Sequence, residues 1–291
     1  MTRAIFRLLP LLVATALAVA ALVAGVGTTV QAIEPHRAEL VERLPDLDQE
    51  TPAELEVKVL DSHAGPSYRL GFRSAVRNVG AGPLIVYGSR PNTETPFMTV
   101  DQLIDRSGEP ARVVRDVGLM KYTISPGHRH WHYLQFDRYE LQRYELLRAG
   151  SNEALVTDRK TGFCLGDRYR AKTARRLQAA SKRPVYTGSC GLGAPDRLYM
   201  QEGISVGWGD DYGAFLEGQD LPLDSLPDGR YVLVHRVNAD RHLEEQSYAN
   251  NAASVLLDLR WWRGKPYLRV IATCPDSDRC AAGDRPAAAA K

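Results

Sequence analysis

The chain has 291 residues, of which 44% are hydrophobic and 25% are charged, and its formal net charge is +2. A chain of this length can bury a sizeable hydrophobic core. The near balance of charge argues neither for nor against a nucleic-acid partner. No basic run, however, is interleaved with aromatic residues in the way that a nucleic-acid-binding surface requires. We therefore expect a globular protein that does not bind nucleic acid.

Residues 1–32 have the features of a secretory signal peptide. Arg3 and Arg7 form a positive start, residues 8–26 are almost unbroken Leu, Ala and Val, and Val30-Gln31-Ala32 resembles a cleavage site. The alternative is an uncleaved membrane anchor, because the apolar run is close to spanning length. The cleavage motif and the polar sequence after it favour export. We expect a secreted or extracytoplasmic protein with no membrane span once the signal is removed.

The rest of the chain has the pattern of an all-β protein. Short runs of alternating apolar and polar residues recur with turn residues between them, which favours an antiparallel β-sandwich with long loops and few short helices. We expect one domain over residues 33–280 and a disordered tail over residues 281–291. Residues 171–181 are the best candidate for a helix, or else a solvated loop. The expected strands are residues 55–59, 68–73, 84–87, 133–147, 231–237, 254–262 and 267–272.

Four cysteines bear on the redox compartment. They are Cys164, Cys190, Cys274 and Cys280. In an exported protein an even number of cysteines indicates disulfides, and four cysteines allow three pairings. The pairs closest in sequence, Cys164–Cys190 and Cys274–Cys280, are the simplest choice. A cysteine-based zinc site is the rival, but the chain has no Cys-x-x-Cys spacing.

The most informative motif is a histidine triplet at alternate positions, His128, His130 and His132. On a strand, alternate side chains share one face, and imidazole suits copper or zinc. The outer two residues start about 13 Å apart along a strand, whereas a metal–nitrogen bond is about 2 Å. The rings must therefore lean inward, or the strand must bend near Ser125-Pro126-Gly127. The alternative is an aromatic-rich strand with surface or packing histidines, but three histidines within five residues favour a metal.

Further motifs downstream make the chain resemble the lysyl oxidase family. They occur in that family's order and at compatible separations, and together they extend over residues 45–262. The segments that carry the resemblance are His128-Arg129-His130-Trp131-His132 and residues 159–165, 203–214, 227–231 and 247–251.

The resemblance implies a copper-dependent amine oxidase. The family's copper ligands match His128, His130 and His132. Its quinone cofactor, lysyl tyrosylquinone, is built from a lysine that matches Lys160 and a tyrosine that matches Tyr212. Such an enzyme oxidises primary amines, peptidyl lysine among them, to aldehydes and consumes oxygen, with release of hydrogen peroxide and ammonia. Taken singly, Lys160 would be a solvated surface lysine and Tyr212 a strand-end aromatic.

The general base is left open by the sequence. Asp210 matches the family pattern slightly better than Asp211, and either could instead be a turn residue. Where vertebrate-type members carry a further histidine after the triplet, this chain has Phe136-Asp137-Arg138-Tyr139, so a role for that histidine does not carry over. The chain also has fewer cysteines than the animal enzymes and no attached matrix-binding module, which makes collagen or elastin a poor guess for the substrate.

A second metal site is suggested by the same resemblance. Glu245, Asn250 and Asn251 match positions associated with calcium in some relatives, and Asp46 with the carbonyl that follows it could complete an oxygen shell. One acidic position of that pattern is Ser247 here. The alternative is a polar turn that leads into the next strand, and the two readings are equally supported.

Three hypotheses follow for function. The first is an exported copper-dependent amine oxidase. The second is a secreted copper-binding β-sandwich without turnover, and the third is a zinc or iron enzyme that uses the same histidines with an open coordination position. Lys160 and Tyr212 favour the first hypothesis, because neither rival requires that pair. A quinone stain of copper-loaded protein would separate the first from the other two.

Overall fold

The computed structural model describes residues 41–63, 65–125, 128–158 and 162–283, all within one unit, Leu40–Lys291. Almost all regular structure in these residues is antiparallel β-strand, as predicted. The helical elements are α1 (Tyr144–Arg148) and the 3-10 helix η1 (Lys172–Arg176). The strands are β1 Glu42–Arg43, β2 Leu47–Gln49, β3 Ala53–Leu60, β4 Ser67–Asn78, β5 Leu84–Ser89, β6 Phe97–Arg106, β7 Glu109–Ser125, β8 His128–Tyr133, β9 Asp137–Arg143, β10 Ala154–Asp158, β11 Tyr169–Arg170, β12 Tyr199–Ile204, β13 Trp208–Tyr212, β14 Asp220–Pro222, β15 Gly229–Val237, β16 Ala252–Trp262 and β17 Lys265–Cys274.

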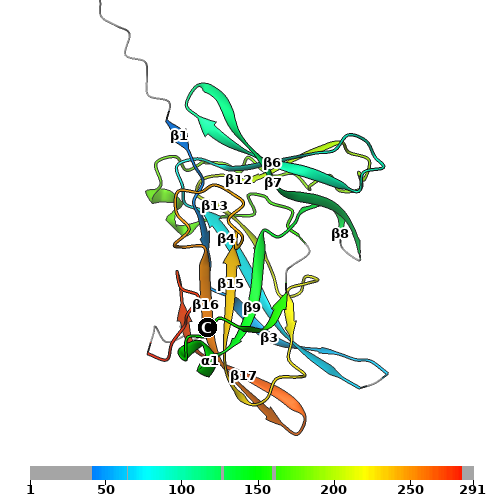
Figure 1. Cartoon of the computed structure of the whole chain (residues 1–291), viewed down its shortest axis with the longest axis vertical. Helices are drawn as coiled ribbons and strands as arrows, with labels where there is room; N and C mark the ends of the chain where they lie inside the picture. The colour runs from blue at the N-terminus through cyan, green and yellow to red at the C-terminus, as the bar shows by residue number, and fades with distance from the viewer. Residues whose placement is uncertain (1–40, 64, 126–127, 159–161, 284–291) are drawn as a thin grey trace, which may run out of the picture. The chain divides into compact units, whose positions relative to one another are not determined.

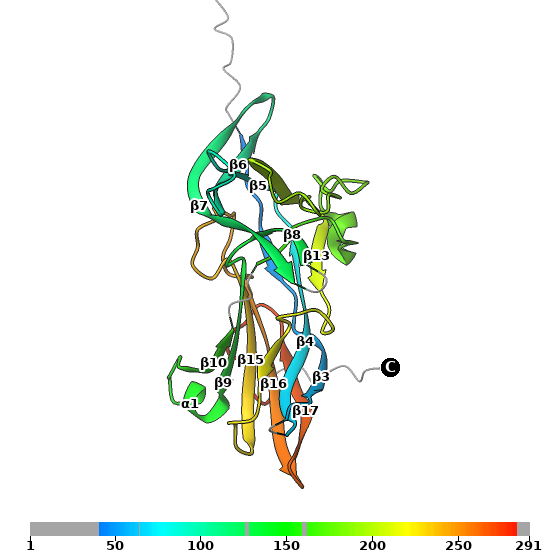
Figure 2. The same cartoon turned by 90° about the vertical axis from the view of Figure 1, so that its right-hand side faces the viewer.

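The strands form three sheets, which can be followed in Figures 1 and 2. The first has the order β12-β5-β6-β7-β8, with β1 beside β6. The second has the order β10-β9-β15-β16-β17. The third has the order β11-β13-β4-β14, with β2 and β3 also paired to β4. The histidine triplet lies on β8, at the end of the first sheet, and Tyr212 ends β13 of the third sheet.

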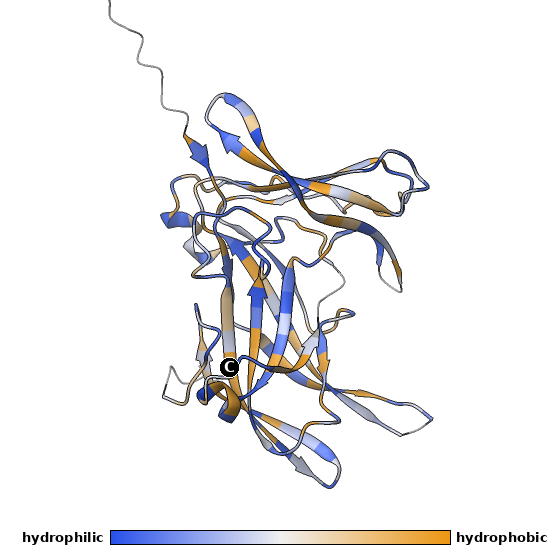
Figure 3. Ribbon diagram, viewed as in Figure 1, coloured by the Kyte–Doolittle hydropathy of each residue, from blue (hydrophilic) through white to orange (hydrophobic). Residues whose placement is uncertain are grey.

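One hydrophobic core joins the sheets. Phe72 of β4 packs edge-on against Tyr139 of β9, with ring centroids 4.7 Å apart, so the third sheet lies against the second. Met120 and Trp131, from β7 and β8 of the first sheet, are fully buried in the same cluster. Figure 3 shows how hydrophobic and hydrophilic residues alternate along many strands, because successive side chains point to opposite faces.

Most predicted strands are confirmed, namely those at residues 55–59, 68–73, 84–87, 231–237, 254–262 and 267–272. The long hairpin of β6 and β7 was not predicted, although the Ser107-Gly108 turn between its strands is a typical turn signal. Gly108 has φ +80, a conformation that glycine adopts without steric cost.

Two sequence predictions of secondary structure were wrong in detail. Residues 133–147 were expected to be strand, but β8 ends at Tyr133, β9 begins at Asp137, and α1 begins at Tyr144. Gln135 has φ 59, which interrupts the extended chain, and Glu, Leu and Arg in α1 are good helix formers. Residues 171–181, expected as a helix or else a solvated loop, are helical only in η1, which ends where Leu177 becomes extended.

The two predicted disulfides are both present, Cys164–Cys190 and Cys274–Cys280. Within the part of the chain that the structure describes, no helix is long and apolar enough to cross a membrane. The predicted signal peptide, residues 1–32, and most of the predicted tail, residues 281–291, lie outside the described residues.

Candidate active site

The rings of the three histidines gather on one side of β8. Their centroids are 5.5 Å apart for His128 and His130, 5.3 Å for His128 and His132, and 4.5 Å for His130 and His132. The outer residues of such a strand are separated by about 13 Å along the backbone, so the rings lean inward as expected. The Nε2 atoms of His130 and His132 are 2.7 Å apart.

The Nδ1 atoms of the two outer histidines face hydroxyl groups of β7. Ser125 Oγ lies 3.1 Å from His128 Nδ1, and Thr123 Oγ1 lies 3.2 Å from His132 Nδ1. Burial lowers the pKa of His130, and the nearby charges of His128 and Arg168 lower it further. A cavity of about 310 Å³ opens beside the outer histidines. The donor set therefore suits a transition metal that accepts imidazole nitrogen.

The rings are close together but do not yet have metal-ligand geometry. Two nitrogens that each bind one metal at about 2 Å with a tetrahedral angle would stand about 3.3 Å apart. The 2.7 Å between the Nε2 atoms of His130 and His132 is a hydrogen-bond distance instead. Consistently, no group of three or more His, Cys, Asp or Glu side chains in the described ranges is already set to hold a metal ion.

The other edge of β8 is covered by the segment that begins at Gly162. Tyr133 and Phe163 exchange backbone hydrogen bonds of 2.8 and 2.9 Å. Gly162 has φ +138, and a Cβ atom there would lie 2.5 Å from the Cβ of His132. Only glycine allows so close an approach with this backbone conformation. The segment that follows residues 159–161 thus runs directly against the histidine strand.

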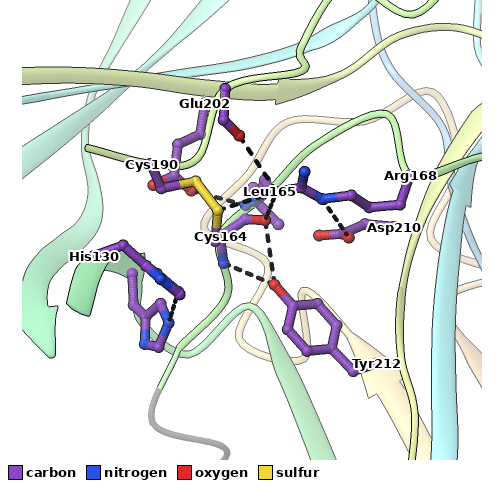
Figure 4. Close-up of a disulfide and its surroundings, with 10 residues drawn as sticks. His130, Cys164, Leu165, Arg168, Cys190, Glu202, Asp210 and Tyr212 are labelled. Carbon is purple, nitrogen blue, oxygen red and sulfur yellow. Dashed lines mark hydrogen bonds and ion pairs between the residues drawn. A yellow bond between two sulfur atoms is a disulfide. The ribbon is translucent and has the colours of Figure 1, made fainter. Parts of the chain in front are cut away.

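Tyr212 binds the same segment. Its hydroxyl accepts a hydrogen bond from the Cys164 N–H at 2.8 Å and donates to the Cys164 carbonyl at 3.2 Å (Figure 4). Its ring meets Phe163 edge-on, with centroids 4.7 Å apart. Burial raises the pKa of Tyr212 well above its ordinary value, and the charge of Asp210 raises it further. Tyr212 is therefore held as a protonated phenol in a fixed orientation.

Asp210 and Asp211 occupy different environments, because neighbouring residues of a strand point to opposite faces. Asp210 is 3% exposed, and its Oδ1 lies 3.7 Å from Arg168 Nε. Asp211 instead pairs with Arg73 at 3.0 Å, and its side chain is about a third exposed. Of the two carboxylates, only that of Asp210 is buried on the side of Tyr212 and Arg168 (Figure 4).

Two residues of this network were missed by the sequence analysis. Arg168 contacts Asp210 and also lies 3.1 Å from the Sγ atom of Cys164. Glu202 accepts the Leu165 N–H at 2.9 Å, and burial raises its pKa well above the ordinary value. No periodicity or motif distinguishes either residue. The nearest signal was their occurrence inside or beside the segments that carry the family resemblance.

Lys160 lies outside the described residues, so its position is a prediction from the sequence. The described chain resumes at Gly162, beside His132, and continues to Cys164, which binds Tyr212.

The four residues predicted for calcium come together. Glu245 is buried and accepts hydrogen bonds from Leu47 N–H at 2.7 Å and from Asn251 Nδ2 at 2.8 Å. Asn250 donates from Nδ2 to Asp46 Oδ1 at 2.9 Å. The Oδ1 atoms of Asn250 and Asn251 have no hydrogen-bond partner among the described residues. Burial raises the pKa of Glu245 to about 7.

This cluster can be read in two ways. The two amide oxygens and two carboxylates are ligands that calcium prefers. The carboxylate of Glu245, however, already accepts three N–H groups, the third from Asn238 Nδ2 at 2.6 Å. Asn238 was not predicted. A cation would have to replace these donors, so the side-chain amides would have to rotate until their oxygen atoms, in place of their nitrogen atoms, faced the cation.

The features on which the comparison with known proteins bears are an all-β fold, a histidine triplet on one strand, and a buried tyrosine bound to the segment beside that strand. The family model described as lysyl oxidase matches residues 111–263, just over half of the chain. The chain belongs to the lysyl oxidase family.

Two curated relatives are similar over part of their length. Human protein-lysine 6-oxidase is 28% identical over 135 residues, which is 45% of this chain and 27% of the human protein. The chicken protein-lysine 6-oxidase is also 28% identical over 135 residues, or 26% of its length. The similarity thus covers about a quarter of each relative.

Proposed function

We propose that this protein is an exported copper-dependent amine oxidase that uses a quinone made from Lys160 and Tyr212. One observation carries the proposal: a single segment contacts both the histidine strand and Tyr212. Gly162 lies against His132, and Cys164 holds the Tyr212 hydroxyl. Membership of the lysyl oxidase family supports an oxidoreductase.

His128, His130 and His132 would hold the copper. Copper held by these residues would supply oxygen-dependent oxidation chemistry; oxidation of the Tyr212 phenol together with addition of the Lys160 amine would give the lysyl tyrosylquinone, the electron sink for amine oxidation. Before that step, the hydrogen bonds from Tyr212 to Cys164 orient the ring, and Phe163 packs against it. The Cys164 backbone and the Phe163 ring therefore hold the buried phenol in place.

Lys160 is our candidate for the lysine of the quinone, because it precedes Gly162 by two residues in the sequence, and the chain from Gly162 to Cys164 contacts both His132 and Tyr212. A lysine amine must be deprotonated to act as a nucleophile, and a partly desolvated site assists by lowering its pKa from about 10.4. Tyr212 lies in such a site, because its ring is buried.

Asp210 is our candidate for the proton acceptor. It is buried on the same strand as Tyr212, and Arg168 supplies the opposite charge. Asp211 is excluded from this role by its pairing with Arg73 on the other face. In the overall reaction a primary amine, oxygen and water give an aldehyde, ammonia and hydrogen peroxide, and Asp210 would hold the proton taken from the carbon beside the amine.

The remaining features of the proposal concern the substrate and the compartment. The substrate would be a primary amine, with peptidyl lysine included because the relatives are named protein-lysine 6-oxidases. Export is supported by the two disulfides, which persist in oxidising compartments. We propose residues 1–32 as the signal peptide and residues 33–280 as the catalytic domain.

A tryptic digest of reduced and alkylated protein tests the proposal directly. Protein matured with copper and oxygen should contain the peptide 160–168 joined to the peptide 198–230 through the Tyr212 ring, because reduction does not break a carbon–nitrogen bond. Cleavage after Lys160 should be blocked, and a quinone stain should be positive. Lys160→Arg provides the matched control, because it keeps the positive charge but cannot form the link.

Separate peptides in full yield from the matured protein would refute the oxidase proposal. If that protein still contained stoichiometric copper, the second hypothesis, a copper-binding β-sandwich without turnover, would replace it. If zinc or iron were bound at the triplet instead of copper, the third hypothesis would be favoured.

We also propose that Asp46, Glu245, Asn250 and Asn251 bind calcium. Two amide oxygens that lack partners among the described residues support this assignment. The bound ion would be structural, since the cluster ties the start of the domain near β2 to the loop before β16.

A further inference from the structure

The strand beside the histidines places a row of polar side chains against them. In the pairing of β7 with β8, Ser125 lies opposite His128, Thr123 opposite His130, and Lys121 opposite His132. Residues directly opposite in an antiparallel pair share a face of the sheet. The two hydroxyl groups therefore lie on the same face as the imidazole rings, immediately behind them.

Each hydroxyl lies at hydrogen-bond distance from the Nδ1 atom of one histidine. Ser125 Oγ meets Nδ1 of His128 at 3.1 Å, directly across the pair. Thr123 Oγ1 meets Nδ1 of His132 at 3.2 Å, along the diagonal. A neutral imidazole has one N–H and one bare nitrogen. A hydroxyl can donate or accept, and where it accepts from Nδ1–H, the Nε2 atom is the bare nitrogen.

A carboxylate completes this arrangement at His128. Glu217 Oε2 lies 3.4 Å from His128 Nδ1, and the Glu217 carboxylate is also hydrogen-bonded to Ser125. Glu217 thus contacts both the hydroxyl and the ring that it faces. The loop that carries Glu217 begins directly after Tyr212, so one side of the histidine strand is tied to the tyrosine strand.

We propose that Thr123, Ser125 and Glu217 are positioning residues for the candidate copper ligands. The two hydroxyls keep the protons of His128 and His132 on Nδ1, which directs the Nε2 atoms toward the metal. Glu217 fixes the Ser125 hydroxyl and the His128 ring, and it couples the loop after Tyr212 to the metal site. Outer-shell partners of this kind orient metal-ligating histidines in general.

The proposal rests on the copper assignment above, so the experiment separates the two. Copper affinity would be measured by competition with a chelator, in Thr123→Val and Ser125→Ala, each of which removes one hydroxyl. Thr123→Ser and Ser125→Thr keep the hydroxyl and are the rescue variants. Thr99→Val, an isosteric change at an exposed position on β6, is the matched control.

We expect Thr123→Val and Ser125→Ala to weaken copper binding by about ten- to a hundredfold. The rescue variants and Thr99→Val should stay close to wild type. Unchanged affinity in both hydroxyl-deleting variants, with wild type binding copper, would overturn the inference and leave the oxidase proposal standing.

A second measurement does not depend on copper. Nitrogen-15 NMR of the metal-free protein should show His128 and His132 protonated at Nδ1, and Thr123→Val should remove that preference at His132 alone. If wild type bound no copper, the oxidase proposal would fail, but the NMR result would still decide the role of the hydroxyls. Protonation at Nε2 in wild type would contradict it. Melting curves would establish that every variant is folded.

Discussion

His235 should make this protein sensitive to acid. It is fully buried on β15 between Phe72 and Tyr139, with ring centroids 4.6 and 4.5 Å away. Burial lowers its pKa to about 3, because the charged imidazolium is poorly solvated in the core. An unfolded chain has a histidine pKa of about 6.5. The unfolded state therefore binds the proton first, and stability falls as the pH drops from about 6.5 toward 3.

The size of the effect follows from the two pKa values. At pH 4 the unfolded histidine is protonated while the folded one is still neutral, and each pKa unit is worth about 1.4 kcal/mol. The interval from 6.5 to 4 thus corresponds to a loss of about 3 kcal/mol of unfolding free energy. For a domain this size such a loss is a sizeable part of the total stability.

His235→Phe removes the titration at small structural cost. Phenylalanine keeps the aromatic contacts with Phe72 and Tyr139. The hydroxyl of Ser74, which lies 3.1 Å from His235 Nδ1, still donates to Asp137 at 2.9 Å. The Nε2 atom of His235 has no hydrogen-bond partner among the described residues, so its loss leaves no group unsatisfied.

Urea unfolding at pH 7.5 and pH 4 measures the effect. The wild type should lose about 3 kcal/mol more than His235→Phe between the two pH values. His242→Gln, a change at an exposed histidine, is the control and should follow the wild type. Equal losses in wild type and His235→Phe would show that His235 is hydrated or charged in the folded protein, and the reasoning from its burial would be wrong.

Three further predictions concern the candidate sites. His130→Ala should abolish stoichiometric copper binding and leave a folded β domain; metal analysis that still gave the wild-type ratio would place the site elsewhere. Tyr212→Phe should prevent quinone formation and peroxide production from primary amines while copper stays bound. It should also lower the free energy of unfolding by about 1–3 kcal/mol, because the Cys164 N–H loses its buried acceptor. Quinone staining of this variant at the level of the wild type would contradict the prediction. Without calcium, the pKa of Glu245 is about 7 in the folded state and about 4.5 in the unfolded state, so between these pH values only the folded state keeps the proton. The free energy of unfolding should therefore fall by up to about 3 kcal/mol as the pH rises from about 4.5 to 7. Added calcium should reverse this fall in wild type but not in Glu245→Gln, as urea unfolding at pH 5 and pH 8 would show; no response to calcium in wild type would remove the calcium assignment.

The sequence predicted those parts of the structure that depend on local pattern. Alternation identified β3 and β4 of the third sheet, the turn signal at residues 227–229 preceded β15 of the second, and the cysteine spacing gave both disulfides. The sequence also predicted that the rings of His128, His130 and His132 would converge, because alternate side chains of a strand lie on one face. The hairpin of β6 and β7 was missed, since β7 is long, largely exposed and without a clean alternation.

The surroundings of the site could not be predicted, because they depend on contacts between segments far apart in the chain. Glu202 meets Leu165 across 37 residues, and Glu217 meets His128 across 89 positions of sequence. Nothing in the local sequence marks a carboxylate that will be buried. The contacts of Ser125 and Thr123 with the histidines could not be predicted for the same reason, because they depend on the register in which β7 pairs with β8.

The disulfide between Cys164 and Cys190 links the compartment to the geometry of the site. The Cys190 carbonyl accepts the Trp131 N–H of the histidine strand at 2.8 Å, and Cys164 holds the Tyr212 hydroxyl through its own backbone. One covalent bond thus connects the two segments that fix the candidate metal ligands and the candidate quinone precursor. Disulfides persist in oxidising compartments, so the export proposed above would preserve this link between the two segments of the candidate site.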